Sequence, residues 1–430
     1  MKKSAILLLA GLCSQLNANP MPKNIIMVVG DGMGPEYTTA YRMLMDDKAT
    51  PEVELTIFDK LLVGMASTHP VHTEGFVTDS AAGATALATG VKTYNGAIGV
   101  DANKQPVPTV LEYAKLQGLK TGVAVTSQIN HATPAGYSAH NVSRHNYDEI
   151  ANSYFDEKLD GKFTLDVMLG GGWKYFIRDD RNLVEEFKNA GYQYIDKLQD
   201  VEQLKANTPT LGLFSDVGMP WALDTPEKQR LPLLVKTAVK QLENDAGFFL
   251  LVEGSQIDWG GHSNDIAASM GEMHDMALTL MWLSEYVDAH PDTLFVVTAD
   301  HSTGGMTIGA RGEYNWQPEW LKNLKSSPTT IAMQLVKSED RIATANEQLG
   351  FELNKEEQTQ LNNIDSSDYK VFYSALKSIL DQRTITGWTT TGHTGIDVQV
   401  FAKGPGKDLF KGHVDNTDIA KNVFSLLGKK

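Results

Sequence analysis

Apolar runs of strand length alternate along the chain with segments of helical periodicity. Four runs rich in Val, Ile, Leu and Phe predict buried strands over residues 24–29, 121–127, 248–252 and 294–298. Apolar residues recur at helical spacing from Val110, from Leu233, and from Asn264 to Asp288. This alternation predicts an α/β fold with a doubly wound, mostly parallel central sheet flanked by helices.

Polar side chains follow each of the four predicted strands. In chain order they are Asp31, then His131 and Thr133, then Glu253, and finally Asp300 and His301. In open α/β sheets ligands bind beyond the carboxyl ends of the strands, so these side chains mark the expected site. Taken alone, Asp31 between two glycines is typical of an ordinary turn.

A serine stands where an extended run turns into a helix of small residues, between Val77 and Gly90. We expect Ser80 to be exposed at the start of that helix. Free backbone N–H groups and the positive helix end would there favour a negatively charged adduct such as a phosphoserine. The alternative, from this segment alone, is that Asp79 or Ser80 only caps the helix.

Two further segments carry metal-ligand residue types. Asp258 and His262 are four residues apart, so either one helical turn or a tight loop can aim both at one ion. An acidic loop with a capping histidine explains them equally well. Asp300 and His301 are adjacent, and both can face one ion only where the strand has already ended.

The N-terminus predicts export. Residues 1–18 combine a basic start, a short apolar run and the small residue Ala18, which is the pattern of a secretory signal peptide. Its apolar run is too short to span a bilayer. Cleavage removes Lys2 and Lys3 and changes the formal charge from −15 to −17. We therefore expect a secreted or periplasmic, acidic protein that binds neither nucleic acid nor membrane.

The remaining 412 positions, residues 19–430, predict one catalytic domain with a large insertion. The 42% hydrophobic content of the whole chain is enough for a sizeable core. Residues from about 305 to 387 break the α/β pattern with a polar sequence that includes Trp316 and Trp320. We interpret this segment as a lid or a subunit contact before the last ligand-bearing loop.

Seven short motifs occur together, in one order, along nearly the whole chain. They are GDGMG at 30–34, TDSAAGAT at 78–85, HATPA at 131–135, SR at 143–144, VEGSQIDWGGH at 252–262, TADHSTGG at 298–305 and GHTG at 392–395. In these motifs the chain resembles the alkaline phosphatase family. The resemblance implies hydrolysis of phosphate monoesters at alkaline pH through a phosphoserine on Ser80, with Arg144 binding the phosphate oxygens. It also implies a homodimer.

The resemblance further implies two zinc ions and one magnesium ion. One zinc would be held by Asp258, His262 and His393, and the other by Asp31, Asp300, His301 and the Ser80 oxygen. Magnesium would share Asp31 with Thr133 and Glu253. Three divalent ions outweigh the four carboxylates by two charges, which would balance a phosphate dianion, and zinc would favour the alkoxide of serine.

Two positions depart from other bacterial members, which carry an acid and a lysine there. His131 is expected beside the magnesium position, where an imidazole would weaken retention of that ion, or else only orders its loop. Trp259 lacks the ammonium that could contact phosphate, so we expect weaker product binding.

Three rival functions share parts of this pattern. A phosphodiesterase has less use for an arginine matched to a dianion. A sulfatase would need a Cys- or Ser-x-Pro-x-Arg maturation motif, and none surrounds Ser80. A secreted protein that only binds metal or phosphate explains the ligand residues but not the serine among them.

Overall fold

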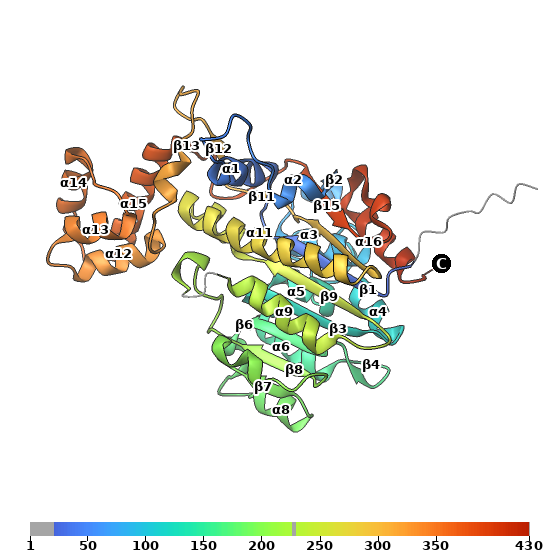
Figure 1. Cartoon of the computed structure of the whole chain (residues 1–430). Helices are drawn as coiled ribbons and strands as arrows, with labels where there is room; N and C mark the ends of the chain where they lie inside the picture. The colour runs from blue at the N-terminus through green and yellow to red at the C-terminus, as the bar shows by residue number, and fades with distance from the viewer. Residues whose placement is uncertain (1–20, 226–228, 430) are drawn as a thin grey trace, which may run out of the picture.

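A ten-stranded sheet forms the centre of the computed structural model, which describes residues 21–225 and 229–429 (Figure 1). Across the sheet the order is β16 (Gly412–Asp415), β2 (Leu62–Ser67), β15 (Val398–Lys403), β10 (Thr293–Thr298), β1 (Asn24–Gly30), β9 (Phe248–Gly254), β3 (Lys120–Gln128), β6 (Val167–Gly171), β8 (Thr210–Leu213) and β7 (Gln193–Ile195). Of the strands in this sheet, β15 alone runs antiparallel to both neighbours. The predicted mostly parallel α/β sheet is thus confirmed.

The four strands predicted from apolar runs lie side by side at the middle of the sheet, in the order β10, β1, β9, β3. In β1, Ile26 is paired with Phe295 of β10 and with Leu250 of β9. Every residue of β1 and β9 is buried. Continuous burial requires cover on both faces, which explains why these strands show no apolar–polar alternation.

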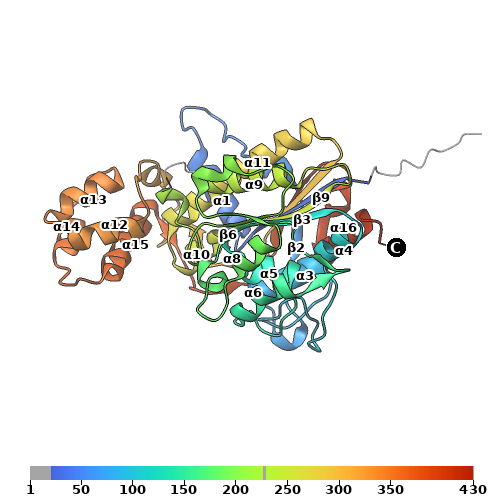
Figure 2. The same cartoon turned by 90° about the horizontal axis from the view of Figure 1, so that it is seen from below.

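Helices cover both faces of the sheet (Figure 2). One face carries α3 (Ser80–Thr89), α4 (Val110–Leu116), α5 (Ala132–Ser138) and α16 (Asn416–Leu426), and the other carries α1 (Pro35–Met45), α9 (Arg230–Leu242) and α11 (Ile266–Ala289). The helix α4 begins at Val110 as predicted, because Thr109 and Glu112 form a capping box there. Met270, Met273 and Met276 of α11 are buried in the core.

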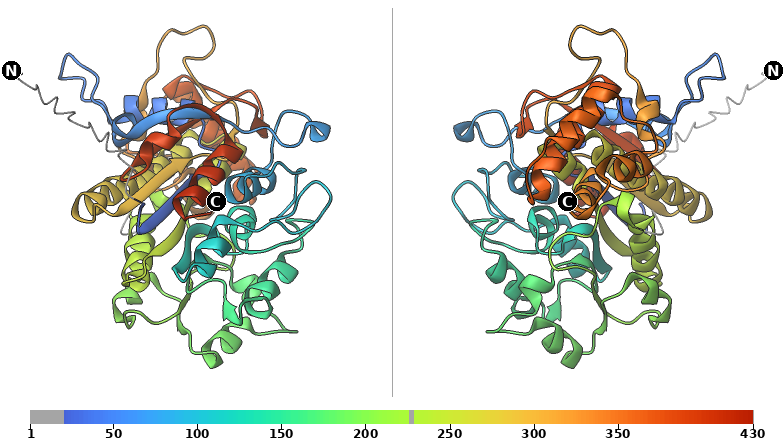
Figure 3. Two further views of the ribbon diagram at one scale, coloured as in Figure 1. Left: turned by 90° about the vertical axis from the view of Figure 1, so that its right-hand side faces the viewer. Right: turned by 90° about the vertical axis from the view of Figure 1, so that its left-hand side faces the viewer.

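The part of the chain that runs from β10 to β15 contains a group of helices that projects from the body of the molecule (Figures 1 and 3). It contains α12 (Pro328–Lys337), α13 (Arg341–Leu349), α14 (Lys355–Asn362) and α15 (Tyr369–Thr384). Tyr373 of α15 donates a hydrogen bond to Asp265 at 2.9 Å, and the Lys377 ammonium contacts the Ser263 carbonyl. The inserted segment is therefore helical and joined to the chain that follows His262.

Within residues 21–225 and 229–429, no helix has both the length and the apolar character that crossing a bilayer requires. The predicted signal peptide, residues 1–18, lies outside the described residues.

Candidate active site

The site lies at one edge of the sheet, where the four central parallel strands end together. Asp31 follows β1, Glu253 lies at the end of β9, Asp300 and His301 follow β10, and His131 follows β3. Gly32 turns the chain after Asp31 with a φ of +72°, and a Cβ there would lie 2.7 Å from the Asp258 Cα. A glycine is therefore required for the two acidic segments to approach each other.

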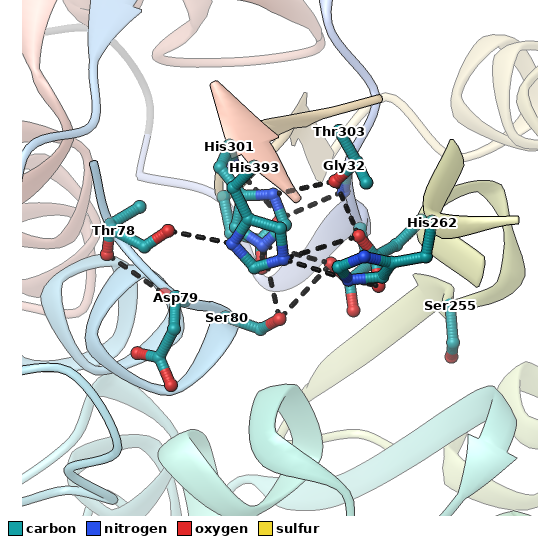
Figure 4. A network of polar contacts seen from close by, with 12 residues as sticks. Gly32, Thr78, Asp79, Ser80, Ser255, His262, His301, Thr303 and His393 are labelled. Carbon is teal, nitrogen blue, oxygen red and sulfur yellow. Dashed lines mark hydrogen bonds and ion pairs between the residues drawn. The ribbon is translucent and has the colours of Figure 1, made fainter. Parts of the chain in front are cut away.

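Ser80 is the first residue of α3, and Asp79 caps that helix by accepting a hydrogen bond from the Ala82 N–H at 2.9 Å. The Ser80 Oγ lies 3.1 Å from His301 Nε2 and 3.4 Å from Asp31 Oδ1 (Figure 4). The expectation that Ser80 is exposed is wrong, because its exposed fraction is only 1%. The helix packs tightly on the end of β10, with a Cβ on Gly83 falling 3.0 Å from the Asp300 Cβ, and this encloses the serine.

The imidazole rings of His262 and His393 turn nitrogen lone pairs toward each other. His393 lies on β14 (His393–Thr394), and its Nδ1 is 2.8 Å from the Thr78 carbonyl oxygen. The Nδ1 of His262 is bonded in the same way to the Thr391 carbonyl. A carbonyl only accepts, so each Nδ1 is the donor and each Nε2 carries a lone pair. These two Nε2 atoms are 3.1 Å apart, and that of His262 is 3.3 Å from Asp258.

His301 is oriented by the same logic. The Thr303 hydroxyl donates to Asp258 at 2.5 Å, so at 3.2 Å it can only accept from His301 Nδ1. The lone pair on His301 Nε2 then faces Ser80, and it lies 3.4 Å from carboxylate oxygens of both Asp31 and Asp300. Clustered lone pairs and carboxylate oxygens fit a divalent cation, which supplies the positive charge that they lack.

A third group surrounds the far side of Asp31. One oxygen of Glu253 accepts from Ser127 at 3.2 Å and from Ser255 at 2.5 Å. Among the buried atoms of the described residues that have no hydrogen-bond partner are three acceptor oxygens of this group: Asp31 Oδ2, Glu253 Oε1 and Thr133 Oγ1. Buried polar atoms of this kind are normally paired, so their convergence indicates a bound ion.

Three sets of ligand atoms therefore lie close enough to hold metal ions. Within each set, the atoms are within 4.8 Å of one another. The sets are Asp258, His262 and His393; Asp31, Asp258 and His301; and Asp31, His131 and Glu253. Asp258 is common to the first and second sets, and Asp31 is common to the second and third.

Electrostatics support the same conclusion. Burial, followed by the charges of Asp300 and Asp258, raises the pKa of Asp31 well above its usual range. Burial also raises the pKa of Glu253, to about 7, and burial lowers the pKa of His301 well below its usual value. Without a cation Asp31 and Glu253 are therefore protonated more readily than ordinary carboxyl groups, whereas a divalent ion would favour their charged form.

Arg144 points into the same region from the loop after α5. Its Nη1 is 3.0 Å from Asp79 Oδ2, and its Nη2 is 3.3 Å from His131 Nε2. Burial lowers the pKa of Arg144, but the charges of Asp79, Asp31 and Tyr147 outweigh this and raise it overall. His131 also meets the Trp259 ring edge-on, with 6.0 Å between centroids. The two departures from the family pattern are thus in contact with each other.

Asp258, Trp259 and His262 all lie on the short helix α10 (Gln256–His262), so the spacing predicted from sequence is one helical turn rather than a loop. This helix is anchored by a buried cluster that sequence analysis missed. Arg230, which is 1% exposed, donates to the Gln256 side chain and contacts Glu272, and its Nε lies 3.3 Å from Asp275. Gln256 in turn donates to the Met219 carbonyl at 2.7 Å.

Sequence analysis also missed the roles of Thr303 and of the pair between Asp79 and Arg144. Thr303 lies in the TADHSTGG motif, two residues after the ligand candidate His301, so its position was a usable signal. No spacing rule connects Asp79 with Arg144 or Arg230 with Gln256, because these contacts join segments that meet only in the folded chain.

Comparisons with known proteins point to one family. The family model described as Alkaline phosphatase matches residues 22–429. Alkaline phosphatase 3 of Bacillus subtilis is 47% identical over 411 residues, which cover 94% of this chain and 89% of that protein. Alkaline phosphatase of Escherichia coli is 35% identical over 352 residues, covering 70% of this chain and 74% of that protein.

Solved structures agree. A cold-active alkaline phosphatase from a psychrophilic Shewanella species superposes with a TM-score of 0.89 at 50% identity, covering 94% of this chain and 99% of that one. The alkaline phosphatase of the Antarctic bacterium TAB5 gives a TM-score of 0.71 at 27% identity, covering 95% and 98%. Because the family model matches residues 22–429 and a relative is 47% identical over 94% of this chain, the chain belongs to the alkaline phosphatase family.

Proposed function

We propose that this protein hydrolyses phosphate monoesters through a covalent phosphoserine on Ser80. The observation that carries the proposal is the position of the Ser80 hydroxyl. It lies at the N-terminus of α3, and its Oγ is 3.1 Å from His301 Nε2. A protein that only bound metal or phosphate would have no need of a nucleophile at this point. Membership of the alkaline phosphatase family, whose members are metal-dependent phosphoric monoester hydrolases, supports the proposal.

For the metals, we propose two zinc ions and one magnesium ion. His262, His393 and Asp258 would hold the first zinc, and His301, Asp300 and Asp31 the second, beside the Ser80 oxygen. Asp31, Thr133 and Glu253 would hold magnesium. The two sets that include imidazole nitrogen suit zinc, and the all-oxygen set suits magnesium. When bound, these ions would supply positive charge that lowers the pKa of hydroxyl groups and stabilises developing negative charge.

The protein's own residues then account for two displacements. Arg144 binds two phosphate oxygens, and its ion pair with Asp79 fixes the plane of the guanidinium. Ser80 Oγ loses its proton and attacks phosphorus as the bond to the ester oxygen breaks, and the leaving oxygen takes up one proton, so that the alcohol is released and the count of protons is unchanged. Water then attacks the phosphoserine, releasing inorganic phosphate and restoring the hydroxyl. The positive end of α3 favours the charged intermediate.

His131 and Trp259 tune this site in the proposal. A neutral imidazole at His131 replaces a carboxylate beside the magnesium position and weakens retention of that ion. Burial, with the charge of Arg144, lowers the pKa of His131 to about 3, so the imidazole stays uncharged. A variant of the TAB5 enzyme in which a histidine is replaced by aspartate has been solved with magnesium bound in its M3 site. Trp259 contributes no positive charge to phosphate binding.

The test is a covalent trap. Metal-replete wild type is incubated with a phosphate monoester and quenched in acid, and the peptide containing Ser80 is examined by mass spectrometry for one added phosphoryl group. Ser80→Ala abolishes both turnover and label, whereas Ser138→Ala, a change of another buried serine outside the site, retains both. Turnover without label on Ser80, or hydrolysis of diesters only, would contradict the proposal.

We further propose that residues 1–18 are a cleaved signal peptide and that the mature protein is secreted or periplasmic. Residues 19–430 form one catalytic domain, and the protein forms a homodimer. The projecting helices α12 to α15, within residues 305–387, act as a lid or a subunit contact. Their position outside the central sheet, with α15 joined to the chain after His262, suits either role.

A further inference from the structure

The helix α15 contacts the chain on both sides of the first proposed zinc set. Lys377 and Asp381 lie one turn apart on this helix, and both are partly buried. The Lys377 ammonium contacts the carbonyl of Ser263, the residue after His262. Asp381 Oδ1 accepts a hydrogen bond from the Trp388 indole N–H at 3.1 Å, in the loop that leads to β14. One helix of the insertion therefore fixes both histidine-bearing segments relative to each other.

The loop between β13 (Thr386–Gly387) and β14 is folded around Trp388. The indole packs on Gly304, where a Cβ would lie 2.8 Å from the ring and 2.9 Å from the Gly261 carbonyl of α10. The Gly304 carbonyl accepts from the N–H groups of the two residues after Trp388, at 3.1 and 3.2 Å, and the Gly304 N–H donates to the Gly392 carbonyl at 2.8 Å. The position of the indole therefore determines where this loop lies relative to α10.

The same loop supplies the carbonyl that orients one of the two histidines. The Thr391 carbonyl accepts from His262 Nδ1, which leaves the Nε2 lone pair of His262 facing His393 (Figure 4). The side chain of Thr391 is exposed, so its carbonyl is placed by the loop and not by packing of that side chain. Such outer partners fix the tautomer and ring orientation of metal-binding histidines. A shift of the loop therefore changes how His262 presents its lone pair.

The contact between Asp381 and Trp388 is directional. An indole N–H only donates, so the carboxyl oxygen must accept. Burial raises the pKa of Asp381 to about 7, and the Trp388 hydrogen bond opposes this shift because it favours the charged form. At alkaline pH the acceptor is therefore a carboxylate, which strengthens the bond. Arg311 Nη2 donates to the Asp381 backbone carbonyl at 2.6 Å and holds the end of α15 in place.

We propose that Asp381 and Trp388 are positioning residues for the first proposed zinc set, and that they act on His262 through the Thr391 carbonyl. The inference rests on the metals named in the proposed function. It gives the insertion a role in addition to that of a lid or a subunit contact. Because α15 holds the histidine-bearing loop from outside the central sheet, the inserted helices contribute to the retention of zinc.

The test measures zinc affinity in Trp388→Phe, which removes the donor, and in Asp381→Leu, which removes the acceptor. Zinc-loaded protein is equilibrated with chelators that set the free zinc concentration, and bound zinc is counted. We expect each variant to lose its first zinc at a free concentration about tenfold higher than the wild type does. The double variant should be no weaker than either single variant, because all three remove the same hydrogen bond. Asp381→Asn keeps an acceptor oxygen and should restore nearly all of the affinity.

A second readout uses the metal-free protein. Nitrogen-15 spectra of histidine-labelled samples report the tautomer, and the fraction of His262 that carries its proton on Nδ1 should fall in Trp388→Phe and in Asp381→Leu.

The matched control is Trp320→Phe. Trp320 is also half-buried in the insertion, and its N–H donates to the Gln317 side chain at 3.1 Å, so the same change removes a bond of the same length elsewhere. This variant should keep the wild-type zinc affinity. If the wild type binds no zinc, the proposed metals fail. If it binds zinc, and either both Trp388→Phe and Asp381→Leu bind it equally well or Trp320→Phe weakens binding as much as they do, the positioning inference alone is overturned.

Discussion

Asp31 shows how one residue connects the parts of the site. Its two oxygens face different neighbours: Oδ1 lies near Ser80 and His301, whereas Oδ2 is one of the unpaired buried atoms on the side of Glu253. One carboxylate therefore lies between the nucleophile and the proposed magnesium position. A change at either position is transmitted through the orientation of a single side chain.

Trp259 provides a test at the scale of one residue. Replacing it by lysine places an ammonium beside phosphate, and we expect the inhibition constant for inorganic phosphate to fall about threefold or more because a charge-assisted contact is gained. Steady-state inhibition assays measure the change.

The matched variant Trp259→Phe removes the indole without adding charge. Equal inhibition of Trp259→Lys and the wild type, or the same strengthening in Trp259→Phe, would show that charge at this position does not determine product binding.

Among the elements, α10 depends on its anchor. In Gln256→Leu the buried Arg230 and the Met219 carbonyl each lose a partner, so we expect a loss of about 2–4 kcal/mol in the free energy of unfolding. A tilted α10 also moves Asp258 and His262. Denaturant unfolding measures the first effect, and zinc affinity by chelator competition measures the second.

Gln241 gives a control of equal burial, at 2% exposed, near the far end of α9, eleven residues along that helix from Arg230. Its oxygen accepts one long hydrogen bond, at 3.5 Å from Gln193. Gln241→Leu should therefore cost less stability and leave zinc affinity unchanged. Equal zinc affinities for the wild type and Gln256→Leu would contradict the anchoring role.

A pH-dependent contact joins Glu112 of α4 to the side chain of His140. His140 Nε2 is 2.9 Å from Glu112 Oε1. Burial lowers the pKa of His140, but the hydrogen bond and charge of Glu112 outweigh it and raise the pKa overall. The pair therefore contributes its whole stabilisation at pH values below the pKa of His140 in the unfolded chain, about 6.5. This stabilisation is lost as the pH rises through the pKa of His140 in the folded protein.

We accordingly expect His140→Gln to lower the melting temperature most at about pH 5–6 and least at about pH 9. Calorimetry across this range measures the difference from the wild type. His413→Gln removes an exposed pair with Asp397 and should have almost no effect at any pH. A cost for His140→Gln that grows with pH would contradict the assignment.

Elements and site residues differed in how far the sequence predicted them. The four central strands were predicted because full burial leaves an unbroken apolar run, and α4 because its apolar residues recur at helical spacing. Short edge strands such as β7 and β16 carry no such run and were not predicted. The structure brings the predicted ligand candidates together at one edge, but the burial of Ser80 and the Arg230 cluster depend on packing between distant segments.

At the scale of the whole molecule, the metals should contribute to stability as well as to chemistry. Removing them leaves Asp31, Asp258 and Asp300 crowded in a buried site, so we expect a chelator to lower the melting temperature by about 5 °C or more. Adding back zinc and magnesium should restore it. Calorimetry with and without chelator provides the measurement.

Adding metal back to the metal-free protein should also release protons. Burial raises the pKa of Glu253 to about 7 and raises that of Asp31, so the metal-free protein holds protons at about pH 6 that the ions displace. Proton release on adding metal should be larger at about pH 6 than at about pH 9. Release that does not depend on pH would mean that these carboxylates are not the ligands.

The separation of the site residues along the chain has a consequence for biosynthesis. His393 reaches the site from β14, whose partner is β11, whereas Asp31 follows the first strand. A ribosome must therefore add 362 residues after Asp31 before the last of these side chains exists, and that residue must also clear the exit tunnel. Every nascent chain that ends before His393 lacks one of the three residues proposed to hold the first zinc, so we expect such chains to be inactive towards the phosphorylated metabolites around them.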